Sequence, residues 1–273
     1  MELYEFTEAT MPSPSNEHFS LHTHSSYEIY LFLEGNSKYV VEGKNYSLSP
    51  YDIIVIRKHD MHRVYHNDCV KYRRITINIE PEFFDVFNCR EYEKQFIDYS
   101  FEIDNKISAK AVKSSGIYDA IMRLKKYTDN FKNTDTPIAV STLIEILYLI
   151  NQLKTFSKAD KSNKQFKEII SYVNANYTDD ISLDKICEMF FFSKYHLCHV
   201  FKKETGLTFR QYINKKRFAL VNDLVSEGIN IGEAAATSGF GSYPVFYRAY
   251  VKEFGISPKE GMNNANSHKS DTQ

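Results

Sequence analysis

Seven basic side chains gather between residues 194 and 217, with one acidic residue, Glu204, among them. The whole chain of 273 residues has a net charge of only −1, so this block is a local feature. Clustered Lys and Arg side chains attract phosphates, and the block therefore indicates a nucleic-acid surface. A solvated helical face is the alternative. The seven are Lys194, Lys202, Lys203, Arg210, Lys215, Lys216 and Arg217.

Histidine and cysteine side chains in the same region suggest a second chemistry, a zinc site. Cys187, His196, Cys198 and His199 are of the types that bind zinc. On one continuous helix, however, His199 directly follows Cys198 and lies three residues after His196, so the four cannot easily converge on a tetrahedral ion. We therefore expect no zinc here.

The elements that carry these side chains form an approximate internal repeat. Residues 181–206 and 231–255 each contain a short helix with small residues, a turn, a serine, and a second helix that ends at a glycine. Ser193 and Ser242 can cap the second helices by accepting a backbone N–H. Small residues at a helix crossing permit the steep packing of a helix-turn-helix. Two such units in tandem favour DNA binding over a plain helical bundle.

This region resembles the AraC/XylS family of bacterial transcription regulators over residues 166–262. The family implies two helix-turn-helix units, joined by a long helix at about 209–226, that bind adjacent major-groove segments. Val221, Ala234 and Pro244 depart from its pattern, although a proline fits a first helical turn. The resemblance is carried by Ser-Leu-Asp-Lys-Ile-Cys (182–187), Ser-Lys-Tyr-His-Leu (193–197), Phe-Lys-Lys-Glu-Thr-Gly (201–206), Tyr-Ile-Asn-Lys-Lys-Arg (212–217), Gly-Phe-Gly-Ser (239–242) and Phe-Gly-Ile-Ser-Pro (254–258).

The resemblance also implies which side chains contact DNA. Those expected to contact bases are Tyr195, Cys198, His199, Tyr243, Val245, Tyr247 and Arg248. Those expected to contact phosphates are Lys194, Lys202, Lys203 and Lys216. These positions leave Leu197, Val200, Phe201 and Phe246 for the core. An arginine can donate two hydrogen bonds to one guanine, and Arg248 is the candidate for that contact.

Residues 20–80 are predicted to form short β-strands. An apolar run at 27–33 is followed by a hairpin at 37–48, with Glu42-Gly43 as its two-residue turn. Residues 74–80 alternate strictly, which places three isoleucines on one face of a strand. Many short strands in about 60 residues predict a sandwich or small barrel.

The histidines of this region resemble the first signature of the cupin barrel, since His22-Thr-His24-Ser-Ser-Tyr-Glu28 is followed by Gly35. Asp52 and His62 fall where its second signature has Asp and His, but Tyr51, Arg57 and His59 replace its Gly, Pro and Gly. Metal cupins bind Fe, Mn or Zn with residues that match His22, His24, Glu28 and His62. AraC-like regulators usually do without the metal, so no cofactor is expected. A metal site and a barrel with satisfied core histidines are the alternatives.

A barrel that binds a small polar molecule needs polar side chains directed inward. Arg74, Thr76 and Asn78 lie on the polar face of the strand at 74–80, and His24 and His62 are further candidates. The sequence does not show which face is inward, and solvent exposure of Arg74 is an equal alternative. The family resemblance implies a sugar or related metabolite as the effector.

Two helices are predicted after the β region. Ile117, Ile121, Leu124 and Phe131 have the spacing of one helical face, and a second helix should begin near Pro137. The apolar residues of the second helix cover more than one stripe. The helix therefore needs two apolar neighbours. The second neighbour is either another subunit or the core of its own domain, and the sequence leaves both alternatives open.

These features predict an α+β protein with an N-terminal cupin-like β-barrel, dimerisation helices, and a C-terminal all-α tandem helix-turn-helix domain. The expected parts are an effector-sensing β domain (1–90), a helical dimerisation region (91–157), a linker (158–165), the DNA-binding domain (166–262) and a disordered tail (263–273). By family analogy, the first eighteen residues form a mobile arm.

No run of eighteen apolar residues and no signal peptide are found, so we expect a cytoplasmic protein without membrane contact.

The expected function is sequence-specific transcription regulation under the control of a small-molecule effector, without catalytic residues. The expected partners are double-stranded DNA, a second copy of the chain and, as a further candidate, RNA polymerase. The alternative is a metal-dependent cupin enzyme, which leaves the C-terminal repeat unexplained. A third interpretation is an adaptor that does not bind DNA. The sequence names neither the effector nor the operator, and it does not decide between activation and repression.

Overall fold

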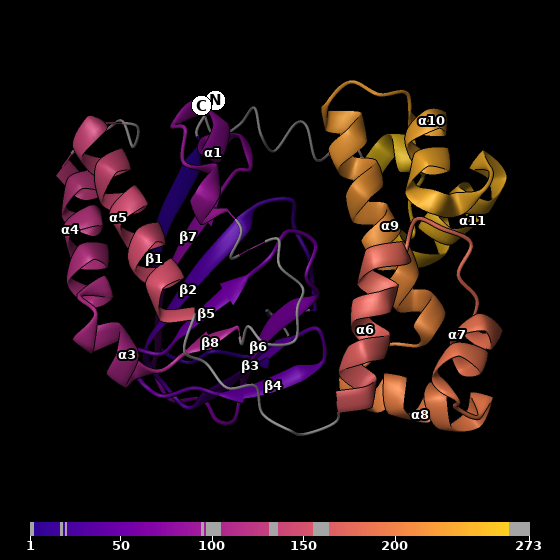
Figure 1. The fold of residues 1–273 in the computed structure, drawn as a ribbon, viewed down its shortest axis with the longest axis horizontal. Helices are drawn as coiled ribbons and strands as arrows, with labels where there is room; N and C mark the ends of the chain where they lie inside the picture. Colours follow the sequence, from indigo (N-terminus) through magenta and orange to yellow (C-terminus); the bar gives the residue numbers. More distant parts are fainter. Residues whose placement is uncertain are drawn as a thin grey trace. The chain divides into compact units, whose positions relative to one another are not determined.

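A computed structural model of the chain describes residues 3–16, 19, 21–93, 96, 105–130, 136–154 and 164–261. The chain divides into two compact units, residues 1–167 and 168–273 (Figure 1). The predicted tail at 263–273 and residues 158–163 of the predicted linker lie outside the described residues. The architecture is α+β, as predicted, with a β-rich first unit and an all-helical second unit.

The strands of the first unit form two antiparallel sheets. The larger sheet has the order β1-β7-β2-β5-β8 and the smaller one β4-β3-β6. Glu42 and Gly43 both have positive φ angles, 49° and 79°, as a two-residue hairpin turn of this kind requires. The predicted hairpin is therefore confirmed, because β3 pairs with β4 across this turn. The strands are β1 (Tyr4–Met11), β2 (Tyr27–Glu34), β3 (Ser37–Val41), β4 (Lys44–Ser47), β5 (Ile53–Ile56), β6 (His62–His66), β7 (Tyr72–Ile79) and β8 (Lys106–Ile107).

The expectation of a mobile N-terminal arm is wrong for residues 4–11. Strand β1 pairs with β7 along its whole length, from Tyr4 opposite Ile79 to Met11 opposite Tyr72. Tyr4 is 1% exposed, and its ring meets the edge of Phe83 at 6.1 Å. A strand that is hydrogen-bonded throughout and anchored by a buried aromatic residue is part of the sheet.

Strand β7 separates two buried layers. Ile75, Ile77 and Ile79 lie in the core between the larger sheet and the helices, which confirms the predicted alternation. Tyr72, on the other face, lies in the core between the two sheets, with residues of β2 to β6. Because side chains alternate along a strand, Arg74, Thr76 and Asn78 share the Tyr72 face and point between the sheets.

Helices cover the outer face of the larger sheet (Figure 1). They are α1 (Glu82–Val86), the short η2 (Arg90–Tyr92), α3 (Ala109–Ser114), α4 (Ile117–Asn130) and α5 (Pro137–Lys154). Ile117, Ile121 and Leu124 are all 0% exposed, as their spacing predicts, whereas Phe131 lies outside the described residues. Helix α5 begins at Pro137, as predicted.

The second unit contains both halves of the predicted repeat. Its helices are α6 (Lys164–Asn176), α7 (Leu183–Phe190), α8 (Lys194–Thr205), α9 (Phe209–Ser226), α10 (Ile231–Ala235), the π-helical turn η3 (Ala236–Phe240) and α11 (Tyr243–Phe254). The long connecting helix has the predicted bounds. Its N-terminus is held by a capping box, in which Thr208 and Gln211 each bond the other's backbone N–H.

The two second helices of the repeat match in length and in their ends. Helices α8 and α11 have 12 residues each and stop at Gly206 and Gly255, whose φ angles are 77° and 73°. Ser193 caps α8 by accepting the N–H of His196 at 3.2 Å, as predicted. Ser242 occupies the equivalent position but makes no side-chain capping bond, so that prediction is wrong. Pro244, in the first turn of α11, removes one of the N–H groups that such a cap uses.

Candidate nucleic-acid interface and barrel interior

Helices α8 and α11 each expose one face and bury the other. The side chains predicted to contact bases lie on the exposed faces: Tyr195 is 84% exposed, Tyr243 41%, Val245 38% and Tyr247 42%, and Cys198, His199 and Arg248 are also exposed. Leu197 and Phe246, at equivalent positions of the repeat, are both 0% exposed. Packing on the buried side therefore fixes which side chains each helix presents to solvent.

Aromatic rings dominate both exposed faces. On α8 the rings of Tyr195 and His199 are nearly parallel, with centroids 6.5 Å apart. On α11 the rings of Tyr243 and Tyr247 are 6.2 Å apart. Because these pairs are four residues apart, each lies on one side of its helix. Both helices thus present flat surfaces with polar edges, which suit contacts with base edges and thymine methyl groups.

Three of the four predicted phosphate contacts are exposed, and one is not. Lys202 and Lys203 are exposed in the last turn of α8, and Lys194 is exposed near its start. Lys194 lies 2.8 Å from Asp184, whose hydrogen bond and charge raise the pKa of Lys194. Lys216 is only 1% exposed, with its ammonium group 5.6 Å from the ring centre of Tyr212. A buried ammonium cannot reach a phosphate, so the prediction for Lys216 is wrong.

A groove of about 560 Å³ lies between α9 and α11 and contains two cations that were not among the four predicted phosphate contacts. Arg210 and Lys252 line it together with Arg248. Both were visible as basic residues, but only the fold shows that they share a groove. Glu253 is the acidic residue of its lining, and its carboxylate lies 2.5 Å from Lys215. The full lining is Thr208, Arg210, Gln211, Asn214, Val245, Arg248, Ala249, Lys252 and Glu253.

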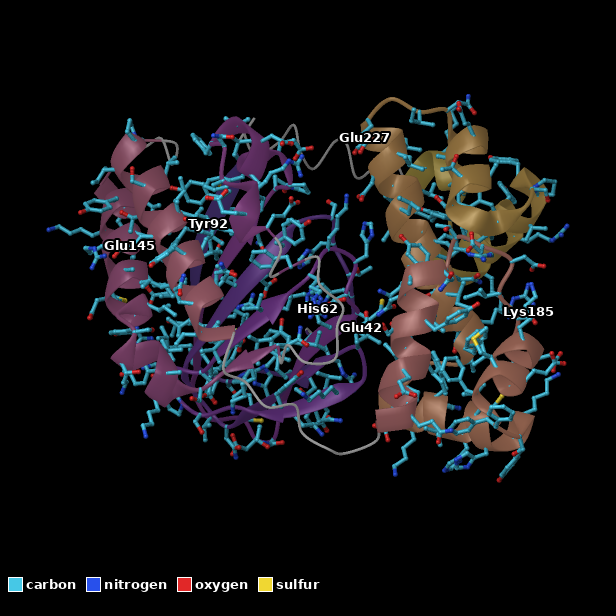
Figure 2. The ribbon with its side chains drawn as sticks, in the orientation of Figure 1. Glu42, His62, Tyr92, Glu145, Lys185 and Glu227 are labelled. Carbon is cyan, nitrogen blue, oxygen red and sulfur yellow. The ribbon has the colours of Figure 1, made fainter. Side chains whose placement is uncertain are left out.

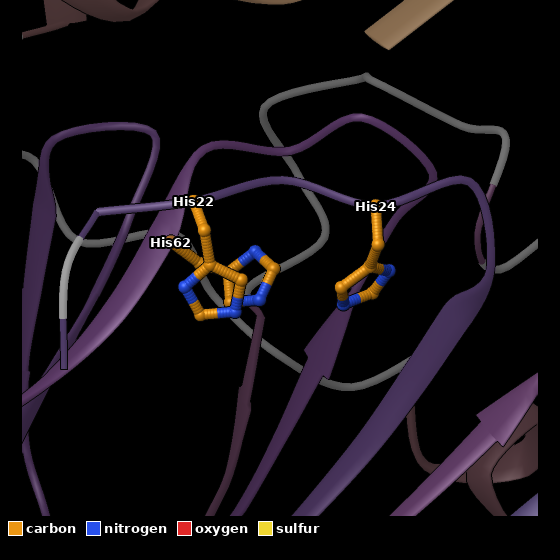
Figure 3. Close-up of side chains that lie close together, drawn as sticks. All are labelled: His22, His24 and His62. Carbon is orange, nitrogen blue, oxygen red and sulfur yellow. The ribbon is translucent and has the colours of Figure 1, made fainter. Parts of the chain in front are cut away.

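In the first unit, a buried carboxylate lies at the centre of the polar groups between the sheets. Glu28 is 6% exposed, and its Oε2 atom lies 3.2 Å from Nε2 of His24 and 4.0 Å from Nε2 of His62. Its other oxygen, Oε1, accepts a hydrogen bond of 3.4 Å from the hydroxyl of Tyr39. Figure 2 labels His62 among the strands of this unit, and Figure 3 shows its ring beside those of His22 and His24, with the candidate metal-ligand atoms of all three within 4.8 Å of one another.

The predicted effector-binding residues of β7 share this interior. Thr76 lies opposite Tyr30 and Asn78 opposite Glu28 in the pairing of β7 with β2. Several buried polar atoms there have no hydrogen-bond partner: Nε of Arg74, Oδ1 of Asn78, Nε2 of His62 and Nε2 of His66. Since buried polar atoms are normally hydrogen-bonded, these atoms indicate a region suited to a polar ligand.

Burial and charge set the protonation of this cluster. Burial lowers the pKa of the His62 imidazole to about 3, so the ring is neutral at physiological pH. Burial also lowers the pKa of His24, but the hydrogen bond and charge of Glu28 outweigh it and raise that pKa. Burial raises the pKa of the Glu28 carboxyl. The hydrogen bond from His24 and the charges of His24 and His62 lower it by more, so the net shift is downward.

Tyrosines complete the interior, and sequence reasoning missed them. The hydroxyls of Tyr30 and Tyr72 are 2.8 Å apart, and burial raises the pKa of both phenols. The rings of Tyr30 and Tyr39 lie 4.6 Å apart and connect the two sheets. The strict alternation of β2 places Tyr30 on the same face as Glu28, and this signal was available in the sequence.

Comparison with protein families assigns both units. The model described as "AraC-like ligand binding domain" matches residues 11–95, and that described as "Helix-turn-helix domain" matches residues 186–264. Together the two matches span more than half of the chain. The chain belongs to the AraC family of transcription regulators. This regulator therefore combines an N-terminal ligand-binding domain with a C-terminal helix-turn-helix DNA-binding domain.

Individual relatives are distant but match most of the regulator. It is 19% identical over 243 residues to the HTH-type transcriptional activator RhaS of Enterobacter sp. (strain 638), covering 89% of this chain and 87% of that protein. RhaS of Escherichia coli (strain K12 / DH10B) matches with the same identity and coverage. Among solved structures, ToxT from Vibrio cholerae is 15% identical with a TM-score of 0.43, covering 96% of this chain and 98% of that one.

The RhaS relatives are named transcriptional activators and the C-terminal unit matches a helix-turn-helix domain, so the chain is a regulator and not the cupin enzyme of the alternative interpretation. The C-terminal repeat that an enzyme would leave unexplained is the DNA-binding domain itself. None of the helices that the structure describes is long and apolar enough to cross a membrane.

Proposed function

We propose that this AraC-family protein is a cytoplasmic transcription activator whose operator binding is controlled by a small polar effector in the β unit. The matched exposed faces of α8 and α11 support DNA recognition most directly. Activation is proposed because the RhaS relatives are named transcriptional activators. RNA polymerase is then a further proposed partner.

In this proposal, each exposed helix face enters a major groove. Tyr195, Cys198 and His199 contact bases from α8, and Tyr243, Val245, Tyr247 and Arg248 contact bases from α11. Lys194, Lys202 and Lys203 bind phosphates and set the salt dependence of binding. The groove between α9 and α11 adds Arg210 and Lys252, whose charge suits the DNA backbone between the two recognition helices.

The proposed effector site is the polar interior of the β unit. His24, His62, Arg74, Thr76 and Asn78 supply donors and acceptors there, and the tyrosine rings supply flat apolar walls. The buried atoms without hydrogen-bond partners support a ligand with several hydroxyl or carboxyl groups, such as a sugar or related metabolite. The effector can shift the protein between two states only by its difference in affinity for them.

We propose that helices α4 and α5 carry a homodimer contact. Ile138 and Tyr148 of α5 are 48% and 45% exposed, although most apolar residues of this helix are buried in its own unit. Exposed apolar side chains beside a packed helix pair suit a second subunit.

Arg248 provides the test of DNA recognition. We expect Arg248→Ala to weaken binding to the operator by roughly 5- to 150-fold, the range that corresponds to about 1–3 kcal/mol for a bidentate contact with guanine. Binding to unrelated duplex should change little. Footprinting upstream of the gene itself identifies the operator, and titration at fixed salt gives both affinities. Lys259→Ala, which removes an exposed cation elsewhere in the second unit, is the matched control. Equal losses on both duplexes would show that Arg248 does not discriminate bases.

A further inference from the structure

Helix α9 connects the two helix-turn-helix motifs, 181–206 and 231–255, and each of its halves packs against one of them. Near its start, the rings of Phe209 and Tyr212 lie 5.4 and 5.3 Å from that of Phe201 in α8, measured between centroids. Further along, the ring of Phe218 lies 5.1 Å from that of Phe240 in the second motif. The angle between α8 and α11 therefore depends on how each motif is held against this one helix.

Arg217, between these two halves of α9, clamps the segment that leads into the first motif. Its Nε donates a hydrogen bond of 2.7 Å to the carbonyl of Tyr177, and its Nη2 donates one of 2.8 Å to the carbonyl of Asp179. Because a guanidinium is planar and presents its donors as a fixed fork, these two bonds define one orientation of the segment. Residues 177–182 run directly into α7, the first helix of the first motif.

The same segment also meets the turn of the second motif. A Cβ atom on Gly239 would lie 2.3 Å from the carbonyl oxygen of Thr178, so the two backbones are in direct contact there. The ring centre of Phe240, the next residue, lies 5.8 Å from the guanidinium carbon of Arg217, within the range of a cation–π contact. The start of the first motif and the turn of the second are therefore joined through Arg217 as well as along α9.

These contacts, and not DNA, account for the charge of Arg217. The residue belongs to the basic block at 194–217, but its side chain is partly buried and two of its nitrogens are bonded to protein carbonyls. Burial lowers the pKa of Arg217 against the effect of Asp179 and Asp180, and an arginine remains charged at physiological pH nevertheless. Because a buried charge is costly to separate from its hydrogen-bond partners, the cluster resists a change in the angle between the motifs.

We propose that Arg217 is a positioning residue that fixes the spacing at which α8 and α11 enter the major groove. The inference rests on the proposed function, in which both helices contact bases of one operator. Sites on successive turns of the duplex lie about 34 Å apart, and one extra base pair shifts and rotates one site relative to the other. A pair of motifs held by Arg217 therefore binds operators of one spacing and rejects the others.

Operators of altered spacing test the proposal on the full-length protein. One base pair is inserted or deleted between the two contacted segments, which footprinting identifies. We expect the parent to lose at least about tenfold in affinity for either altered duplex, a loss comparable to that from a wrong base pair. Arg217→Lys should lose at most about threefold, since an ammonium lacks the fixed fork of the guanidinium. Arg217→Ala should lose the preference in the same way, with circular dichroism to verify its fold.

Two further measurements separate positioning from other roles. The dependence of affinity on salt should be unchanged in Arg217→Ala, whereas removal of a phosphate contact would reduce its slope by about 0.9 and overturn the proposal. In the free protein, Arg217→Lys should speed hydrogen exchange at residues 177–182 and 236–242, because the contacts that join them are weakened. Unchanged exchange in both segments would contradict the clamp.

The matched control is Arg210→Lys, the same change at an exposed residue of the same helix. It should weaken binding by equal factors at all three spacings, since Arg210 acts on the DNA and not on the angle between the motifs. A parent that binds all three spacings equally would overturn recognition by two helices together with this proposal. A parent that discriminates between them, with the full preference kept in Arg217→Lys, would overturn this proposal alone.

Discussion

At the residue scale, Gly239 is a position where any side chain would clash with the backbone of another segment. It lies in the turn of the second helix-turn-helix with a φ angle of 88°, and a Cβ atom there would lie 2.3 Å from the carbonyl oxygen of Thr178. Gly228 has a similar φ angle, 90°, but nothing lies within 4 Å of its Cβ position. The pair therefore separates the cost of backbone conformation from the cost of a steric clash.

We expect Gly239→Ala to lower the free energy of unfolding by roughly 2–4 kcal/mol, because the substitution combines an unfavourable φ with a backbone clash. Gly228→Ala should cost only about 1 kcal/mol, the conformational part. Denaturant unfolding of the full chain, followed by a probe in the second unit, measures both. Equal losses at the two sites would mean that Thr178 moves away freely.

The sequence was enough to predict which residues of the recognition helices are exposed, but not which cation is buried. Tyr195 and Arg248 follow from the positions of the caps and from the apolar residues that must face inward. Three consecutive residues of α9 are basic: Lys215, Lys216 and Arg217. Because neighbours on a helix point about 100° apart, at least one of the three must face inward on a helix that is largely buried. The choice of Lys216 depends on packing around Tyr212, which no local pattern shows.

At the scale of elements, one carboxylate ties the edge strand to a helix. Glu8 of β1 accepts hydrogen bonds from Lys125 of α4 and from Arg73 of β7. The bond from Lys125 is the main cause that lowers the pKa of Glu8, against the effect of burial. The side chain of Glu8 is 21% exposed, so solvent screens the pair only partly.

We expect Glu8→Gln to destabilise the first unit by about 1 kcal/mol at neutral pH. A carboxyl whose folded pKa is below its unfolded value stabilises the fold above the unfolded pKa. That contribution is lost as the pH falls through the folded pKa. The difference between parent and variant should thus be complete above about pH 5 and be lost as the pH falls through the lowered pKa of Glu8 in the folded protein. Thermal unfolding across this range measures it, with Glu5→Gln, at an exposed residue of the same strand, as the control. A pH-independent difference would exclude the ion pair as its cause.

The repeat shows how far element-level prediction extends. The bounds of α9 and the glycine stops were predictable because they rest on local backbone chemistry. The two departures from the family pattern, Val221 and Ala234, lie in one buried cluster, where a larger residue on α9 accompanies a smaller one on α10. The pairing of β1 with β7 was not predictable, because nothing local to residues 4–11 specifies a partner more than 60 residues away.

At the scale of the whole molecule, each unit has its own core and its own chemistry. The aromatic and basic surface belongs entirely to residues after 168, and the polar interior belongs entirely to residues before it. Two cores that share no cluster can fold separately.

The fragment of residues 160–273 tests this separation. We expect it to fold, to remain monomeric and to bind duplex DNA at low salt without responding to effector, because α8, α9 and α11 and their core lie within it.

The logarithm of the fragment's affinity for DNA should fall linearly with the logarithm of salt concentration. Since each phosphate contact contributes about 0.9 to that slope, replacing Lys202 and Lys203 by alanine should reduce the slope by nearly two. Fluorescence anisotropy at several salt concentrations gives the slopes, and Lys259→Ala again serves as the control. A folded fragment that binds no duplex at low salt would place the DNA-binding function outside these helices, whereas an unchanged slope would remove the two lysines from the phosphate-binding set.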